Sequence, residues 1–326
     1  MAFGQHAHFL FQWDSLWFME IAQHGYPSVL ASTAFFPLLP VIIHSLGPSM
    51  ALIANQGVCL GILLLLPSSL QRIGMHEAAS RRAVWFFALN PALIFYSVLY
   101  AEAWTMLGIL VTLNLMTRQR IWLAAITALL TTLTQGPALF LGAFPLTLFF
   151  SALHRRDFLN AWRSLVVGVA CASGFGSYAI YLALTFHRPL LIFQVQHLWG
   201  QVMMSPWHQW IQAIGIVVGQ HDAGMALLWI AVTLLVLGSL VAILVSVRAG
   251  FFGASLYMIL GLILSLSFGM TYPFHSTVRF LSDYFPVYGG LAALTSHKWL
   301  LGLLLVVSAG IGLLGSVLFA HSWAFQ

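Results

Sequence analysis

Apolar runs with almost no charged residues follow one another along most of this 326-residue sequence, and they limit what it can fold into. Charged residues make up only 6% of the chain and hydrophobic residues 61%, which is incompatible with a soluble domain of this size. The sequence therefore predicts an all-α polytopic membrane protein. The runs fall at residues 35–47, 51–70, 83–98, 103–117, 121–134, 137–152, 164–186, 224–247, 251–270, 282–296 and 299–320.

Several of these runs are shorter than the ~20 residues that a full crossing of the hydrocarbon core needs. We expect such spans to be partly unwound, flanked by interfacial aromatic residues or shielded by neighbouring helices, and such irregular spans usually surround a cavity. The run at 35–47 contains Pro37 and Pro40 and ends at Gly47-Pro48. Because these residues break helices, we expect this run to dip into the membrane and return, which leaves 51–70 as the crossing.

The basic residues indicate the orientation in the membrane. Ten of the twelve lie in five connections between apolar runs, and Lys and Arg gather in cytoplasmic loops. No continuous basic face exists, so nucleic acid is not an expected partner. The five groups are Arg72 with Arg81 and Arg82, Arg118 with Arg120, Arg155 with Arg156 and Arg163, Arg248, and Lys298.

The opposite, non-cytoplasmic face then receives most of the remaining polar residues. Its loops are residues 1–34, 100–102, 135–137, 187–222 and 271–281. Charged groups at membrane depth are costly and are therefore usually functional. We expect the following residues to converge on this face: Asp14, Glu20, Glu102, Gln194, Gln196, His197, Trp199, Trp207, His275 and Arg279.

The first of these loops carries two carboxylates beside a dense aromatic cluster, in W-D-S-L-W-F-M-E-I-A-Q-H-G-Y. The segment is too short to span a bilayer, so it predicts a short interfacial helix that begins near Asp14 and stops at Gly25. Glu20 would be rotated from Asp14 by roughly 240°, so the two carboxylates should not share a face. Asp14 is a candidate catalytic group; the alternative is an N-cap that binds the amide of Leu16 or Trp17.

Two further charges have a functional and a structural interpretation. Glu102 lies between apolar runs with no basic residue nearby in sequence, so it is either part of a site or a turn residue that faces water. Arg279 suggests an anionic partner, most simply a phosphate, because guanidinium binds phosphate through paired hydrogen bonds. Its alternative is a helical ion pair with Asp283, four residues further on.

Residues 187–222 form a long polar loop in which tryptophans alternate with amides and histidines. Trp199, Trp207 and Trp210 could stack on sugar rings while the amides bind hydroxyls; the alternative is an interfacial aromatic belt. The two cysteines lie inside apolar runs, and no His or Cys cluster has the spacing of a metal site. No metal or cofactor is expected.

Five segments in series resemble one family. The segments are W-D-S-x-W-F-x-x-I-A-x-x-G-Y, A-F-F-P-L-L-P at 34–40, N-P-A-L-I-F-Y-S-V-L-Y-A-E at 90–102, Q-H-L-W-G at 196–200 and V-R-F-L at 278–281. Together they are similar to the PIG-V-type mannosyltransferases, which are GT-C glycosyltransferases. Eukaryotic members add the second mannose of the GPI anchor core.

The resemblance implies an architecture and a reaction. The architecture is a single domain over residues 1–326 with about ten transmembrane helices, short amphipathic helices on the non-cytoplasmic face, a catalytic first loop at 1–34 and a second large loop at 187–222. The reaction is an inverting transfer of mannose from a polyprenyl- or dolichyl-phosphate carrier to a glycolipid or other acceptor, on the outer or lumenal face. The expected location is the plasma membrane if bacterial, or the endoplasmic reticulum if eukaryotic. Family members normally have a transmembrane helix before the first loop, which is expected to be missing or truncated here.

The resemblance also implies roles for residues. Its Trp-Asp pair matches Trp13-Asp14, and its Gln-His pair matches Gln196-His197. A phosphate-linked sugar carries its own leaving group, so the enzyme needs a base and a cation, for which we expect Asp14 and Arg279. Glu102 is the rival base. The expected substrate-binding residues are Trp13, Glu20, Glu102, Gln196, His197, Trp199 and Arg279, with an apolar groove beside residues 35–47 for the lipid tail.

Two other classes remain as alternatives. A transporter or flippase of lipid-linked sugars would also place carboxylates and aromatic residues in a membrane cavity, but such proteins tend to show repeated halves, which this sequence lacks. A non-catalytic membrane scaffold is disfavoured by the concentration of polar residues on one face.

Overall fold

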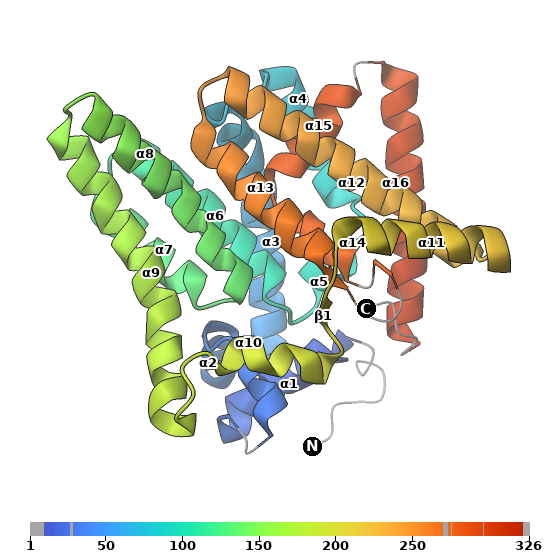
Figure 1. Ribbon diagram of the computed structural model, residues 1–326, viewed down its shortest axis with the longest axis horizontal. Coiled ribbons are helices and arrows are strands. Elements are labelled where there is room, and N and C mark those ends of the chain that lie inside the picture. Colours follow the sequence, from blue (N-terminus) through green and yellow to red (C-terminus); the bar gives the residue numbers. More distant parts are fainter. Residues whose placement is uncertain (1–9, 27–28, 270–272, 275, 296, 322–326) are drawn as a thin grey trace.

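The computed structural model describes residues 10–26, 29–269, 273–274, 276–295 and 297–321, and all distances below refer to these. This part of the chain is all-α, with 16 α-helices, short 3-10 helices and one two-stranded ladder (Figure 1). Five of its helical segments are long and apolar enough to cross a membrane, which suggests a multi-pass membrane protein. They are α3 (Pro48–Arg72), η3 with α8 (Gly136–His154), α9 (Phe158–Phe186), α12 (Ala223–Arg248) and α16 (Lys298–Ala320).

The remaining elements are shorter and lie between or beside these five. They are α1 (Asp14–His24), η2 (Leu30–Ala34), α2 (Leu38–Leu46), α4 (Glu77–Ala88), α5 (Leu93–Ser97), α6 (Glu102–Thr117), α7 (Ile121–Thr132), α10 (Leu191–Gln194), η4 (Val195–Trp199), α11 (Pro206–Gln220), α13 (Phe252–Ser267), α14 (Thr277–Ser282) and α15 (Pro286–Leu294). Strand β1 (Val202–Met203) pairs with β2 (Phe268–Gly269) in antiparallel register.

The run at 35–47 is not a full crossing. It forms only α2, whose nine residues span about 14 Å, less than half of a hydrocarbon core of about 30 Å. The helix stops at Gly47, which has φ 77°, and α3 begins at Pro48. The expectation that only the following run crosses is consistent with these lengths.

Two breaks between helices contain a proline, and one of them interrupts a predicted run. The run at 83–98 divides into α4 and α5 around Asn90-Pro91, where the Asn90 side chain accepts the backbone N–H of Ala92 at 2.7 Å. The segment after Arg279 divides into α14 and α15 at Pro286. Proline ends a helix because it lacks an amide hydrogen and clashes with the preceding turn.

The basic connections meet at one end of the molecule, which is drawn uppermost in Figure 1, while α1 and α10 lie at the other end. This grouping agrees with the positive-inside pattern of the sequence. Asp157 caps α9 at this end, and hydrogen bonds from the backbone and side chain of Asn160 lower the pKa of its carboxyl group. Three contacts join the connections: Arg72 Nη1 to Thr117 Oγ1 (2.6 Å), Arg163 Nη1 to Gln119 Oε1 (2.9 Å) and Arg82 Nη2 to the Ala292 carbonyl (3.1 Å).

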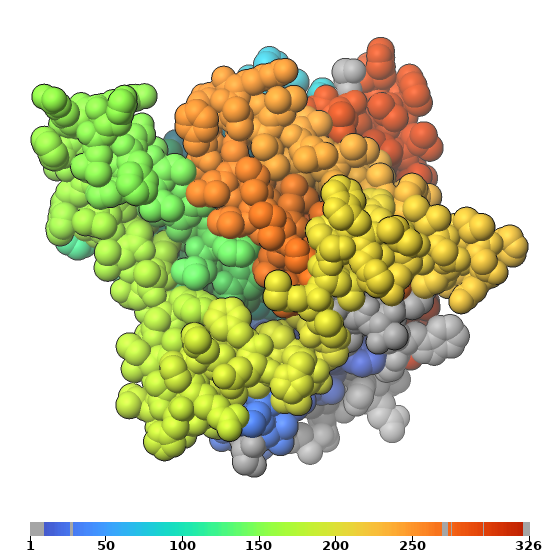
Figure 2. Space-filling view, viewed as in Figure 1, coloured from blue at the N-terminus to red at the C-terminus, as the bar shows by residue number. Residues whose placement is uncertain are grey.

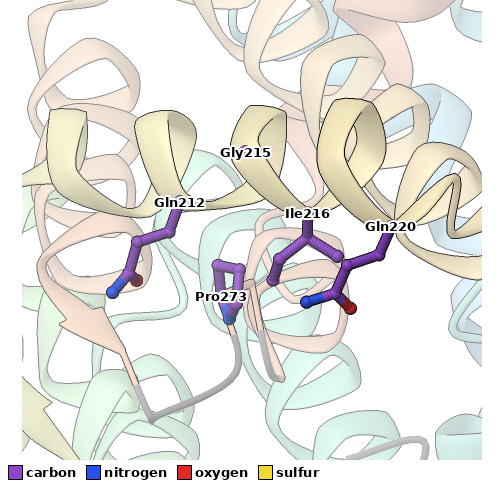
Figure 3. Close-up of a pocket in the computed structure, with 5 residues that line it drawn as sticks. All are labelled: Gln212, Gly215, Ile216, Gln220 and Pro273. Atoms are coloured by element: carbon purple, nitrogen blue, oxygen red, sulfur yellow. The ribbon is translucent and has the colours of Figure 1, made fainter.

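Helix α11 stands out from the bundle as a ridge (yellow in Figure 2). One of its faces is apolar and exposed, including Trp207 at 74% exposure. Another face turns Gln212, Ile216 and Gln220 towards Pro273 and lines a hollow of about 250 Å³ (Figure 3).

Candidate functional site

Three of the predicted site residues meet around a single guanidinium group. Arg279 Nη2 donates a hydrogen bond to Asp14 Oδ2 at 2.7 Å, and Arg279 Nε donates to Glu102 Oε1. Asp14 and Glu102 are 265 and 177 residues away from Arg279 in the chain. The fold therefore brings together one cation and two carboxylates from α1, α6 and α14.

Local structure places each of the three at the start of a helix or close to it. Asp14 and Glu102 are the first residues of α1 and α6, where the helix dipole favours a negative charge. Arg279 is the third of the six residues of α14, which follows Ser276 at φ 61°. The backbone N–H of Asp14 donates to Tyr100 Oη at 3.2 Å, which ties the start of α1 to the segment that leads into α6.

The N-cap alternative for Asp14 is wrong. Trp13, with φ 53°, occupies the N-cap position, and no side chain caps the helix there. The amides of Ser15 and Leu16 donate instead to the backbone carbonyls of Gln12 and Trp13. The Asp14 carboxylate is thus available to Arg279.

The structural alternatives for Glu102 and Arg279 are also wrong. Glu102 does not face water, because its side chain is fully buried against Arg279. Asp283 is not the partner of Arg279; its two carboxylate oxygens accept hydrogen bonds from Tyr96 Oη at 3.0 Å and Gln135 Nε2 at 3.1 Å. The helical spacing that suggested the pair fails because α14 ends at Ser282.

Aromatic rings cover the guanidinium group. Its central carbon lies 4.7 Å from the ring centroid of Tyr100 and 5.3 Å from that of Phe95, which is cation–π distance. The side chains of Arg279 and Asp14 are each 15% exposed, whereas Glu102 is not exposed. A ligand can therefore reach this group from the side of Asp14 and Arg279.

Several buried polar atoms on the same segments have no hydrogen-bond partner among the described residues. An unpaired buried polar atom costs about 1–3 kcal/mol, so such atoms are usually satisfied by water or by a ligand. Trp13 also packs into the cluster that contains Phe95 and Tyr100, next to the Arg279 guanidinium. The unpaired atoms on these segments are Trp13 Nε1, Ser15 Oγ, Glu102 Oε2, Trp104 Nε1 and Thr277 Oγ1.

Glu20, the third predicted carboxylate on this face, is not brought to the Arg279 group. Its side chain is 51% exposed and pairs with His24, four residues further on, at 3.1 Å. Asp14 and Glu20 thus point in different directions, as their spacing along a helix predicts.

The second large loop is fastened to the first by Trp199. Its Nε1 donates to the carbonyl of Ala31 at 3.2 Å, and its ring packs edge-on against Trp17 at 5.5 Å and Phe35 at 5.4 Å. Gln196 and His197 bond only to their own turn, through the carbonyls of Ile192 and Gln194, among the interactions that the structure describes. His275, also expected on this face, lies outside the described residues.

An apolar groove of about 600 Å³ lies between α1, α2 and α9, where the sequence places one beside residues 35–47. The hydroxyls of Tyr26 and Tyr178 are turned away to the backbone carbonyls of Phe35 and Thr33, at 2.7 and 2.8 Å. The rings therefore present apolar surface to the groove. It is lined by Ile21, Ala22, Gln23, Gly25, Tyr26, Pro37, Pro40, Val41, His44, Leu133, Ser177, Tyr178 and Tyr181.

Sequence reasoning missed the role of Tyr100 and the aromatic lining of the groove. Tyr100 lies two residues before Glu102 in the segment at 90–102, and this short distance to a charged residue could have indicated its role. Tyr178 and Tyr181 lie within a long apolar run and carried no signal of their own. Among the described residues, no group of three or more His, Cys, Asp or Glu side chains is placed to hold a metal ion.

Comparisons with protein-family models, with curated proteins and with solved structures found no match to this chain.

Proposed function

We propose that the protein is a membrane glycosyltransferase, which transfers mannose with inversion from a polyprenyl- or dolichyl-phosphate carrier to an acceptor. The observation that carries the proposal is the pairing of a partly accessible carboxylate, Asp14, with a partly accessible guanidinium, Arg279, at 2.7 Å. One group can accept a proton and the other can bind a phosphate. The choice of mannose and of the lipid carrier rests on the sequence resemblance.

The two groups suit the two bond changes of the reaction. Asp14 removes the proton of the acceptor hydroxyl as its oxygen attacks the anomeric carbon of the sugar. The bond between that carbon and the phosphate oxygen breaks on the opposite face, and both of its electrons leave with the phosphate. Arg279 stabilises the charge of the departing polyprenyl phosphate, and Asp14 later returns its proton to water.

The apolar groove suits the lipid tail of the carrier. Helix α1 connects the two sites, because Asp14 begins it and Ala22, eight residues later, lines the groove. Eight helical residues span about 12 Å, so a phosphate at Arg279 and a tail in the groove can belong to one molecule. Val41 and Tyr181 in the lining are 58% and 38% exposed, which gives a membrane lipid lateral access.

We further place this site on the non-cytoplasmic side, with about ten helices crossing the membrane. The support is that α1, which begins at Asp14, lies at the end remote from the basic connections, and the positive-inside rule assigns those connections to the cytoplasm (Figure 1). Trp13, Gln196, His197 and Trp199 then remain candidates for contacts with the sugar or the acceptor.

The test is transfer of radiolabelled mannose from polyprenyl-phosphate mannose by the purified full chain in proteoliposomes, with native-membrane lipid extract as the acceptor. Replacing Asp14 by Asn keeps the size of the side chain and an oxygen for Arg279 but removes the basicity. We expect a loss of about 10²–10⁴-fold in rate. Glu77→Gln is the matched control, because Glu77 is an exposed carboxylate that pairs with Arg81.

Near-normal transfer by a folded Asp14→Asn protein would rule out Asp14 as the base. A wild-type protein that carries the labelled donor across the bilayer without transferring its sugar would favour the flippase.

A further inference from the structure

Glu102 is too deeply buried to serve a substrate directly in this structure. Its side chain is fully buried, and its described side-chain hydrogen bond goes to Arg279 Nε. We propose that Glu102 is a positioning residue, which holds the Arg279 guanidinium so that its free edge faces the phosphate of the donor. This inference rests on the proposed function, and it states that Glu102 acts on the donor through Arg279.

The hydrogen-bonding capacity of arginine supports the assignment. A planar guanidinium has five N–H donors, and those of Nε and of one side of Nη2 lie along the same edge. That edge is occupied by Glu102 and Asp14. The outer edge, formed by Nη1 and the second hydrogen of Nη2, makes no hydrogen bond to the described residues, and it can hold two phosphate oxygens at once.

The rings beside Arg279 cannot fix this orientation alone. The ring centroids of Tyr100 and Phe95 lie 4.7 and 5.3 Å from the guanidinium carbon, and a cation–π contact contains no N–H···O hydrogen bond that would select one edge of the guanidinium. The directional bond from Nε to Glu102 determines which edge points outward. Without the bond to Glu102, Asp14 could accept hydrogen bonds from both Nε and Nη2 of Arg279. Arg279 would then hold the Asp14 carboxylate more tightly, and its guanidinium would rotate.

The cost of the arrangement argues for a role beyond stability. A buried ion pair often contributes little net stability, because removing both charges from water offsets their attraction. Glu102 also has its second oxygen, Oε2, buried without a described partner. A hydrophobic residue would fill this position at lower cost, but it would leave Arg279 unoriented.

Chemical rescue tests the inference in the full-length protein in proteoliposomes, with polyprenyl-phosphate mannose as the donor. Arg279→Ala should lose most transfer, and guanidinium chloride at matched ionic strength should restore part of it, at least about 10-fold, by occupying the space of the deleted group through a charged hydrogen bond to Glu102. The same rescue should fail in Arg279→Ala with Glu102→Gln, and it should persist in Arg279→Ala with Glu77→Gln. Urea, which has a similar shape but no charge, should not rescue. Equal rescue with and without Glu102 would overturn the inference.

A second measurement does not need the Ala variant to fold. Glu102→Gln alone should raise the KM for the donor by about 10–100-fold, the value of one charged hydrogen bond, and leave the KM for the acceptor lipid unchanged. Glu102→Asp should recover part of the loss. An unchanged donor KM in folded Glu102→Gln protein would overturn the positioning role of Glu102. It would leave the proposed transferase function unaffected. A wild-type protein that neither binds nor transfers the donor overturns both.

Discussion

The Tyr100 ring lies beside Arg279, with its centroid 4.7 Å from the guanidinium carbon. Its hydroxyl oxygen also accepts the backbone N–H of Asp14 at 3.2 Å. One side chain therefore contacts both the proposed base and the proposed cation. The relative position of Asp14 and Arg279 therefore depends on Tyr100 as well as on the ion pair between them.

Substitutions of Tyr100 separate its two contacts. Tyr100→Phe removes the hydrogen bond and keeps the ring, so we expect transfer to fall by about 2–10-fold, equivalent to one neutral hydrogen bond. Tyr100→Leu also removes the cation–π contact, and transfer should fall by about a further 2–10-fold. Initial rates and unfolding temperatures of both proteins provide the measurement. Equal rates for the two variants would show that the ring does not act on Arg279.

The groove can be filled without changing the Arg279 group. Val41 lines it and is 58% exposed, so Val41→Trp should hinder a long lipid tail. We expect the KM for a long-chain polyprenyl-phosphate mannose to rise by about 5–50-fold, the effect of losing about 1–2.3 kcal/mol of apolar burial. A short-chain donor should be unaffected. Leu64→Trp is the control, since Leu64 is 71% exposed on α3 and does not line the groove. The same KM change in both variants would rule out the groove as the tail site.

Cysteine labelling checks the orientation. On sequence alone, Ser32 and Ser80 are natural positions for labels, but both side chains are fully buried. Ser205 and Ala78 are exposed, and the sequence assigns their loops to opposite faces of the membrane. In intact cells, Ser205→Cys should react with an impermeant maleimide and Ala78→Cys should not. The reverse pattern would place the Asp14 site in the cytoplasm.

His197 and Trp199 should respond differently to replacement by alanine. Trp199 joins the two loops through Ala31, so Trp199→Ala should reduce the amount of folded protein, and Trp199→Phe should recover part of it. His197 is exposed and bonds only to its own turn among the described interactions, so His197→Ala should lower transfer at an unchanged protein level. Detergent-extracted protein and transfer rate are measured on the same sample. Full activity of His197→Ala would remove His197 from the site.

The positions of the helices could be predicted from the sequence because apolar runs and their breakers are local features. The end of α2 at Gly47 was predicted from the Gly47-Pro48 pair, whereas the break at Asn90-Pro91 inside the run at 83–98 was not predicted. The number of helices that cross the membrane does not follow from length alone, since α6 and α13 have 16 residues each.

The residues of the candidate site could be predicted from the sequence better than the ion pairs that they form. Asp14, Glu102 and Arg279 stood out because each is a rare charge among apolar residues. The sequence offered Asp283 as the partner of Arg279, since spacing rules apply only within one helix. The true partners come from α1 and α6, and only the packing of distant helices brings them together.

Residues near the two ends of the described part of the chain are in contact. Gln12 Nε2 donates to the carbonyl of Ala320 at 3.1 Å, across 308 residues, and Asp14 depends on α14 for its cation. During synthesis, the two carboxylates therefore leave the ribosome long before Arg279. Until α14 is in place, Asp14 and Glu102 lack the counter-ion that Arg279 provides, so the centre is completed only when α14 joins the fold. A chain that stops before α14 would hold both carboxylates of the centre without their cation.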